Sequence, residues 1–157
     1  MTAPVVHLAD LPARGGQRPR TTRATPHRQV SQTAPVTLQD ELMRRAATLP
    51  GVRLGETLVS VPGARALHLA EELARGPTEA FQRWPEFAHM HPAHDGSLHL
   101  TLPPAVRAAV LAKGWGEPHP VSGAVLAYGP RDRDELEVVW ALLVASYRYA
   151  CGLPTTT

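Results

Sequence analysis

The sequence predicts one α+β domain, in which a mainly antiparallel sheet of about five strands is packed by helices on one face. Short runs alternate apolar and polar residues between turn formers, as expected for strands of a half-buried sheet. Two longer segments, near residues 37–49 and 132–150, instead repeat apolar residues with the period of a helix. No internal repeat and no second core are visible along the 157 residues.

The first 32 residues lack periodicity and are rich in Pro, Thr and Arg. We expect residues 1–17 to be a disordered or loosely attached tail, residues 18–152 to form the domain, and residues 153–157 to be a short tail. Residues 18–32 keep a basic, hydrogen-bonding character, typical of a solvated arm or of an extended arm over a pocket. The second interpretation would offer a ligand Arg20, His27, Arg28 or Gln29.

The first helix is expected to begin at Thr37, whose hydroxyl can cap the amides near Asp40. Pro50 and Gly51 end its apolar stripe.

Two short runs, residues 57–61 and 65–69, then flank Pro62-Gly63-Ala64 and predict a hairpin. Its faces would separate Val59 and Val61 from His68, so that His68 shares a face with other histidines further along the chain. A short helix is expected near residues 77–83.

The densest group of titratable side chains lies in a second predicted hairpin, Glu86 to Leu102. Its two alternating runs flank a five-residue segment rich in turn formers, residues 92–96. If His91 pairs with Ser97, His89 lies opposite His99. One face then carries Phe87, His89, His91, Ser97, His99 and Thr101, and the core face carries Ala88, Met90, Leu98, Leu100 and Leu102.

The rest of the chain supplies two helices and a strand. A helix is expected over residues 103–113, followed by an irregular segment, residues 114–120, that carries Trp115 and His119. Residues 124–128 predict a buried strand ending at Tyr128. In the last helix, Asp132 and Glu135 have the spacing of a capping box.

Composition excludes several classes of function. The net charge of +2 gives no nucleic-acid signal, and the single Cys151 cannot form an internal disulfide. No stretch approaches 18 apolar residues and no basic segment precedes an apolar run, so we expect a cytoplasmic protein without a membrane partner. The sequence contains no P-loop, dinucleotide fingerprint, G-x-S-x-G or H-E-x-x-H motif.

Three interpretations of the histidine face remain open. His89, His91 and His99 can ligate zinc or iron, with Glu86 and Asp95 orienting the rings. Without a metal, the same imidazoles can deprotonate an acidic substrate and hold its anion. The third interpretation is a purely structural set of polar cross-strand pairs.

Several motifs together resemble the luciferase-like domain family, which includes the fungal luciferases and is distinct from the flavin-dependent bacterial luciferases. They are E-F-A-H-M-H-P-A-H-D-G-S-L-H-L-T-L-P at residues 86–103, G-W-G-E-P-H-P at 114–120, L-A-Y-G-P-R-D at 126–132, P-H-R-Q at 26–29 and P-G-A-R at 62–65. The resemblance covers residues 18–152.

The resemblance implies oxidation of an acidic enol, such as 3-hydroxyhispidin or another hydroxypyrone, by O2 without a dissociable cofactor. His89, His91 and His99 would then be catalytic, acting as base and anion stabiliser. The substrate-binding candidates are Arg20, His27, Gln29, His68, Glu86, His94, Asp95, Trp115, His119 and Tyr128. A three-histidine zinc or iron enzyme and a non-enzymatic small-molecule binding domain remain alternatives. The expected partners are a small molecule and O2, with homodimerisation left open.

Overall fold

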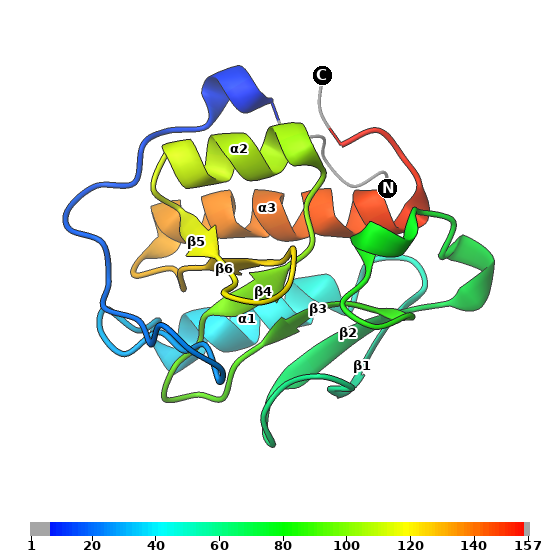
Figure 1. The fold of residues 1–157 in the computed structure, drawn as a ribbon, viewed down its shortest axis with the longest axis horizontal. Helices are drawn as coiled ribbons and strands as arrows, with labels where there is room; N and C mark the ends of the chain where they lie inside the picture. The colour runs from blue at the N-terminus through cyan, green and yellow to red at the C-terminus, as the bar shows by residue number, and fades with distance from the viewer. Residues whose placement is uncertain (1–6, 156–157) are drawn as a thin grey trace.

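Six antiparallel strands form a single sheet in the computed structural model, which describes residues 7–155 (Figure 1). They are β1 (Val52–Glu56), β2 (Arg65–Leu69), β3 (Glu86–Met90), β4 (Leu98–Leu100), β5 (Gly116–Pro118) and β6 (Val125–Ala127). Their order in the sheet is β1-β2-β3-β4-β6-β5. The predicted α+β class is confirmed, with one strand more than expected.

Three helices complete the core: α1 (Val36–Ala46), α2 (Pro104–Ala112) and α3 (Arg133–Cys151). Single 3-10 turns occur at Leu8–Asp10, Glu71–Leu73 and Thr78–Ala80, the last within the short helix expected near residues 77–83. In Figure 1, α1 and α3 lie behind the sheet and contact each other, whereas α2 packs beside β5. Among residues 7–155, no helix has the length and apolar character needed to cross a membrane.

Helix α1 begins one residue earlier than expected, and Thr37 is not its cap. The carbonyl of Pro35 accepts hydrogen bonds from the amides of Leu38 and Gln39. Thr37 therefore lies inside the first turn, where its hydroxyl no longer precedes the free amides. Gly51, with φ of +77°, follows the helix as a turn residue.

The prediction that residues 57–61 pair with residues 65–69 in a hairpin is wrong. The strand that pairs with β2 is β1, and Glu56 lies opposite Arg65. Residues 57–61 form a loop because the Glu86 carboxylate binds the Thr57 hydroxyl and the Leu58 amide, at 3.0 and 2.6 Å. This loop leaves Val59 48% exposed, and neither Val59 nor Val61 lies on a strand face as the hairpin prediction required.

The predicted pairing of His89 with His99 is confirmed, and the His91 amide donates to the Ser97 carbonyl. The assignment of Phe87 to the histidine face is wrong. A bulge changes the register of β2 against β3, from Leu67 opposite Ala88 to His68 opposite Glu86. The bulge turns Phe87 towards Tyr147 of α3, with ring centroids 6.1 Å apart, and brings Glu86 to the histidine side.

Thr101 also departs from the predicted histidine face. Strand β4 ends at Leu100, so alternation does not continue to this residue. The Thr101 hydroxyl donates to the carbonyl of Ala80 and lies 3.3 Å from the Ser146 hydroxyl of α3. Thr101 therefore joins the helix side of the sheet.

The segment 114–120 is more regular than predicted, because residues 116–118 form the edge strand β5. At Gly116, an added Cβ would lie 2.5 Å from the Leu126 carbonyl oxygen, so the close approach to β6 requires glycine. Pro118 ends the strand at the sheet edge, where its missing N–H is tolerated. The buried strand expected at residues 124–128 is present as β6.

Residues 7–17 pack on the domain, in contrast to the loose tail expected for residues 1–17. Leu11 belongs to the hydrophobic core, and Arg14 is buried with its guanidinium 5.2 Å from the centre of the Tyr128 ring. The first six residues of the predicted tail and residues 156–157 lie outside the described part of the chain.

Helix α3 begins with the predicted cap. The Asp132 side chain accepts the Glu135 amide at 2.9 Å, while the Glu135 carboxylate accepts the Arg131 amide and guanidinium. Burial acts to raise the pKa of Glu135, but the bonds from Arg131 outweigh it and leave this pKa below its ordinary value. The start of α3 is thus held by one cap and one ion pair.

Replacing the cap should destabilise the domain. We expect Asp132→Ala to lower the free energy of unfolding by about 1 kcal/mol, because the Glu135 amide loses its acceptor. Urea denaturation monitored by circular dichroism measures the change. Asp134→Ala is the control, since Asp134 lies in the same first turn without serving as the cap; equal losses in the two variants would contradict a capping role.

The ion pair should make stability depend on pH. The lowered pKa of Glu135 means that its contribution is complete above the unfolded carboxyl pKa, about 4.3, and disappears as the pH falls through the folded value. Glu135→Gln should therefore be most destabilising near neutral pH and nearly harmless in acid. Thermal unfolding of both proteins across this range tests the sign, and a destabilisation that grows towards acid would disprove it.

Candidate functional site

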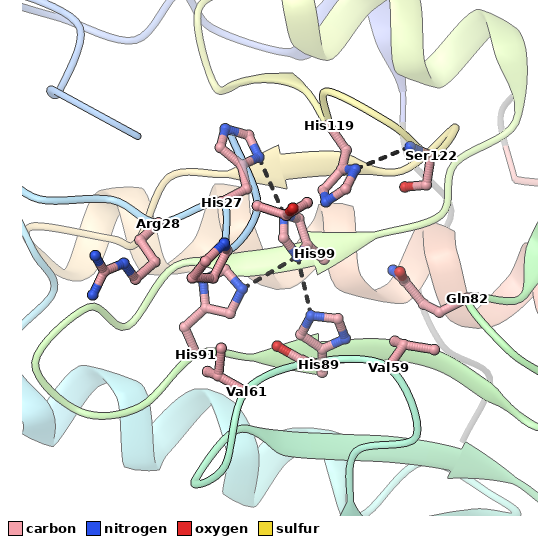
Figure 2. A pocket seen from close by; sticks show the side chains of 13 residues that line it. His27, Arg28, Val59, Val61, Gln82, His89, His91, His99, His119 and Ser122 are labelled. Carbon is pink, nitrogen blue, oxygen red and sulfur yellow. Dashed lines mark hydrogen bonds between the residues drawn. The ribbon is translucent and has the colours of Figure 1, made fainter. Parts of the chain in front are cut away.

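A cavity of about 470 Å³ lies on the sheet face opposite α1 and α3 (Figure 2). Its walls come from the N-terminal arm (residues 20–30), the loop after β1, the histidines of β3 and β4, and the segment joining β5 to β6. The lining residues are Thr25, Pro26, His27, Arg28, Val59, Ser60, Val61, Gln82, His89, His91, His99, His119 and Ser122. Histidine is the most frequent residue type in this lining.

Three imidazoles converge at the floor of the cavity. Nδ1 of His99 lies 3.0 Å from Nε2 of His89 and 3.2 Å from Nε2 of His91. All three residues are buried, with at most 5% of their surface exposed. The predicted cross-strand grouping therefore brings ring nitrogens, and not only ring faces, into contact.

A carboxylate lies behind each of the two β3-side rings. Oε1 of Glu86 is 2.9 Å from Nδ1 of His89, and Oδ2 of Asp95 is 3.1 Å from Nδ1 of His91. Ser97 also lies 2.9 Å from Nδ1 of His91 and donates its hydroxyl to Asp95. We assign the proton of each ring to Nδ1, facing its carboxylate, so that both Nε2 atoms point a lone pair at His99.

Both carboxylates are held as anions. Burial acts to raise the pKa of Glu86, yet the bonds from His89, Leu58 and Thr57 outweigh it and keep this pKa below its ordinary value. The pKa of Asp95 is lowered in the same way, against burial, by bonds from His91 and Ser97.

Burial and crowding favour the neutral rings of His89 and His99. Burial is the largest cause lowering the pKa of His89, and His91 adds to it while Glu86 opposes it. For His99, burial followed by the neighbouring imidazoles places the pKa far below its ordinary value.

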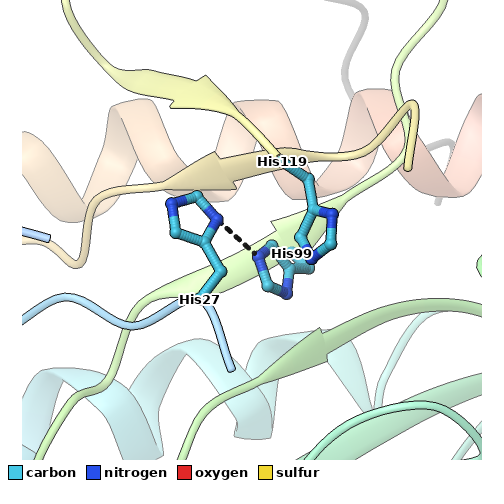
Figure 3. Close-up of side chains that lie close together, drawn as sticks. All are labelled: His27, His99 and His119. Atoms are coloured by element: carbon cyan, nitrogen blue, oxygen red, sulfur yellow. Dashed lines mark hydrogen bonds between the residues drawn. The ribbon is translucent and has the colours of Figure 1, made fainter. Parts of the chain in front are cut away.

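His27 reaches the cluster from the N-terminal arm (Figure 3). Its Nδ1 lies 3.4 Å from Nε2 of His99, and its Nε2 lies 3.0 Å from the Glu117 carboxylate of β5. The ring is 3% exposed, so a residue in a segment that could have been a solvated arm is instead part of the cavity wall.

His119 completes the set with the opposite tautomer. Its Nδ1 accepts the amides of Val121 and Ser122 at 3.1 and 3.0 Å, which leaves the proton on Nε2. Partial burial, then the neighbouring His27, lowers the pKa of His119 and favours this neutral ring. His119 is therefore a hydrogen-bond donor through Nε2, whereas His89 and His91 are acceptors.

The N-terminal arm is fastened mainly by Glu117. This carboxylate accepts the hydroxyls of Thr21 and Tyr128 at 3.0 Å in addition to its contact with His27. Gln29 adds a second attachment. Its side-chain oxygen accepts the Gly129 backbone amide, and its backbone amide donates to the Asp95 carboxylate. The arm is thus tied to β5, to the end of β6 and to the turn after β3.

Four predicted site residues lie away from the cavity. Nε2 of His68 contacts the Glu56 carbonyl at 2.8 Å, and the Trp115 indole donates to the Pro12 carbonyl. His94 and Arg20 are both exposed, His94 in the turn between β3 and β4 and Arg20 on the outside of the arm.

The other predicted residues support the lining. Glu86, Asp95, Gln29 and Tyr128 do not line the cavity. Glu86 and Asp95 bind His89 and His91, Tyr128 binds Glu117, and Gln29 ties the arm to Asp95 and Gly129. Burial and the neighbouring Glu117 raise the pKa of Tyr128 to about 12, so its hydroxyl remains a donor.

Sequence reasoning missed Glu117 and the apolar wall made by Val59 and Val61. Glu117 was recognisable only as a functional residue type near His119, since its partner His27 lies 90 positions away.

Among the described residues, two triads have ring nitrogens that all lie within 4.8 Å of one another and could hold a metal ion: His89, His91 and His99, and His27, His99 and His119.

The fold and the site define a small antiparallel α+β domain with a buried, carboxylate-supported histidine cavity. The family model described as a luciferase domain matches residues 85–146, which include β3, β4 and most of α3. The chain belongs to this luciferase domain family.

Fungal proteins named luciferase are similar to the chain over most of its length. The protein of Armillaria ostoyae is 31% identical over 173 residues, and that of Armillaria gallica 32% over 171 residues. These alignments cover 96% and 94% of this chain but 65% and 64% of the two relatives. The luciferase of Neonothopanus nambi is 38% identical over 78 residues, 44% of this chain and 29% of that protein. No solved structure shows significant similarity.

Removing the Glu117 carboxylate should loosen the arm. In Glu117→Ala, three polar groups lose their acceptor, so we expect amide hydrogen exchange at Thr22 and Val30 to accelerate about tenfold or more. Hydrogen–deuterium exchange with mass spectrometry measures this. Glu72→Ala, at an exposed 3-10 turn, is the control; unchanged exchange in the arm of the Glu117 variant would show that other contacts hold it.

Proposed function

We propose that this protein is an oxygenase that oxidises an acidic enol of the hydroxypyrone class with O2. Membership of the luciferase domain family supports the reaction class. The observation that carries the proposal is the arrangement of acceptor and donor nitrogens: two Nε2 lone pairs, of His89 and His91, lie in the same cavity as the Nε2–H of His119.

An acidic enol must lose its hydroxyl proton before its ring carbon can react with O2. The lone pairs of His89 and His91 are suited to receive that proton, because the carboxylates behind the rings stabilise a positive charge on them. The Nε2–H of His119 is suited to donate to the enolate oxygen. Oxygen then adds to the electron-rich carbon, and a peroxide formed there would be stabilised by the same donors.

The volume and lining of the cavity suit a small ring-containing substrate. Its volume of about 470 Å³ lies within the range of pockets that enclose small ligands. Val59, Val61 and Pro26 supply apolar surface for a ring, while Arg28 and Gln82 supply polar groups at other parts of the lining. Loss of carbon dioxide and emission of light are further steps that the proposal includes only as outcomes to be measured.

Oxygen uptake is the direct measurement. Purified protein should consume O2 with 3-hydroxyhispidin or a related hydroxypyrone, and we expect His89→Ala and His91→Ala to lower kcat/KM by about 100-fold or more. Carbon dioxide and photons are recorded in the same reactions.

His7→Ala is the matched control, because His7 is an exposed histidine that does not line the cavity. The proposal would be abandoned if no pyrone were consumed, or if the folded His89 and His91 variants kept full activity. Tight binding of a pyrone without turnover would instead indicate a small-molecule binding domain.

A further inference from the structure

We infer that His89, His91 and His99 form a binding site for one divalent first-row transition metal ion, with Nε2 of His89, Nε2 of His91 and Nδ1 of His99 as its protein ligands. Metal binding at these atoms goes beyond the proposed function. It uses the Nε2 lone pairs that the proposed function assigns as proton acceptors, so in the metal-bound protein His89 and His91 would act as ligands and not as bases.

The first step is a count of ring protons. In neutral His89 and His91 the single proton is on Nδ1, where each ring faces a carboxylate, so neither Nε2 carries one. Both Nε2 atoms face Nδ1 of His99, at 3.0 and 3.2 Å. A neutral His99 carries a single ring proton. It can donate to these Nε2 atoms only when that proton is on Nδ1, and its own Nε2 is then unprotonated.

His27 presents a further unprotonated nitrogen to His99. Its Nε2 faces the Glu117 carboxylate, so its proton belongs there and its Nδ1 lone pair faces Nε2 of His99. If His99 keeps its proton on Nδ1 for His89 and His91, two lone pairs face each other across 3.4 Å. The neutral cluster therefore has fewer protons than its contacts require.

One metal ion satisfies every contact at once. It takes the three converging lone pairs, while Nδ1–H of His89 and His91 donates to Glu86 and Asp95 and Nε2–H of His99 donates to His27. Metal-bound histidines commonly have a carboxylate, carbonyl or water on the other nitrogen. At Zn–N distances near 2.05 Å, tetrahedral coordination places neighbouring ligand nitrogens about 3.3 Å apart, close to the 3.0 and 3.2 Å that separate Nδ1 of His99 from the other two nitrogens.

The charge of the surroundings also fits a cation. Glu86 and Asp95 are 0% and 1% exposed. Their hydrogen-bond partners among residues 7–155 are histidines, hydroxyls and backbone amides, with no arginine or lysine. Two buried negative charges are balanced by one divalent ion.

The second triad, His27, His99 and His119, does not have the same property. Nδ1 of His119 already accepts two amides, so its Nε2 carries a proton and has no lone pair for a metal. His27 is needed as the acceptor for His99 in the network above. The two triads share His99, and only the first has three free lone pairs.

Three neutral imidazoles suit zinc, iron, copper and related ions, and leave coordination positions open. When bound, such an ion supplies positive charge for an anionic oxygen, as an enolate requires. His119, with its donor nitrogen, remains free to bind the same ligand.

Metal content and a spectroscopic titration test the inference without an activity assay. Protein purified without a histidine tag is stripped with chelator and titrated anaerobically with Zn²⁺, Fe²⁺ and Co²⁺. We expect one ion per chain by elemental analysis, and visible absorption of bound Co²⁺. His91→Ala should lower the affinity by at least about 100-fold, and His7→Ala should not change it.

One further variant guards against misfolding. Asp95→Asn keeps all three ligands and should lower the affinity about 10- to 100-fold, since it removes a carboxylate behind a ligand. Circular dichroism establishes which variants are folded. Failure of the folded wild-type protein to bind any of the three ions, or unchanged binding by a folded His91→Ala variant, would overturn the inference.

The outcomes separate this inference from the proposed function. Oxygen uptake by wild-type protein that binds none of the ions overturns the metal site and leaves the oxygenase standing. One ion bound per chain, with no pyrone oxidised, supports the metal site and refutes the oxygenase.

Discussion

The Glu86 carboxylate is the contact on which the arrangement of the cavity depends. It is fully buried, binds Nδ1 of His89 on one side, and binds the Thr57 hydroxyl and Leu58 amide on the other. A single anion therefore fixes the tautomer of a floor residue and the path of the loop that carries Val59 and Val61. A buried carboxylate without these partners would be strongly unfavourable, so ring, loop and carboxylate stabilise one another.

The bulge in β3 is what brings Glu86 to this position. Regular alternation would point Glu86 and His89 to opposite faces, since they are three residues apart. The extra residue in β3 places both on the cavity side and sends Phe87 to α3. The same irregularity thus serves the core and the site, in keeping with the occurrence of bulges next to functional groups.

The parts of the fold that sequence could predict are those fixed by near neighbours. The pairing of His89 with His99 follows from a hairpin with a short turn, and the Asp132 cap follows from spacing within one helix turn. The bulge was not predictable, because it depends on how β2 pairs with β3. The role of Glu117 was not predictable for a similar reason, because it depends on the contact between β5 and the arm, which are far apart in the sequence.

The floor and the arm of the cavity are held in place by different kinds of contact. The floor of the cavity belongs to the central strands, whose other face packs against the helices, whereas Thr25, Pro26 and Arg28 belong to an arm held by polar contacts with few core side chains. Substitutions in the floor must be compatible with the packed central strands, whereas changes in the arm must preserve its attachments to Glu117, Gly129 and Asp95. Ligand range can therefore evolve through the arm while the chemistry of the floor stays constant.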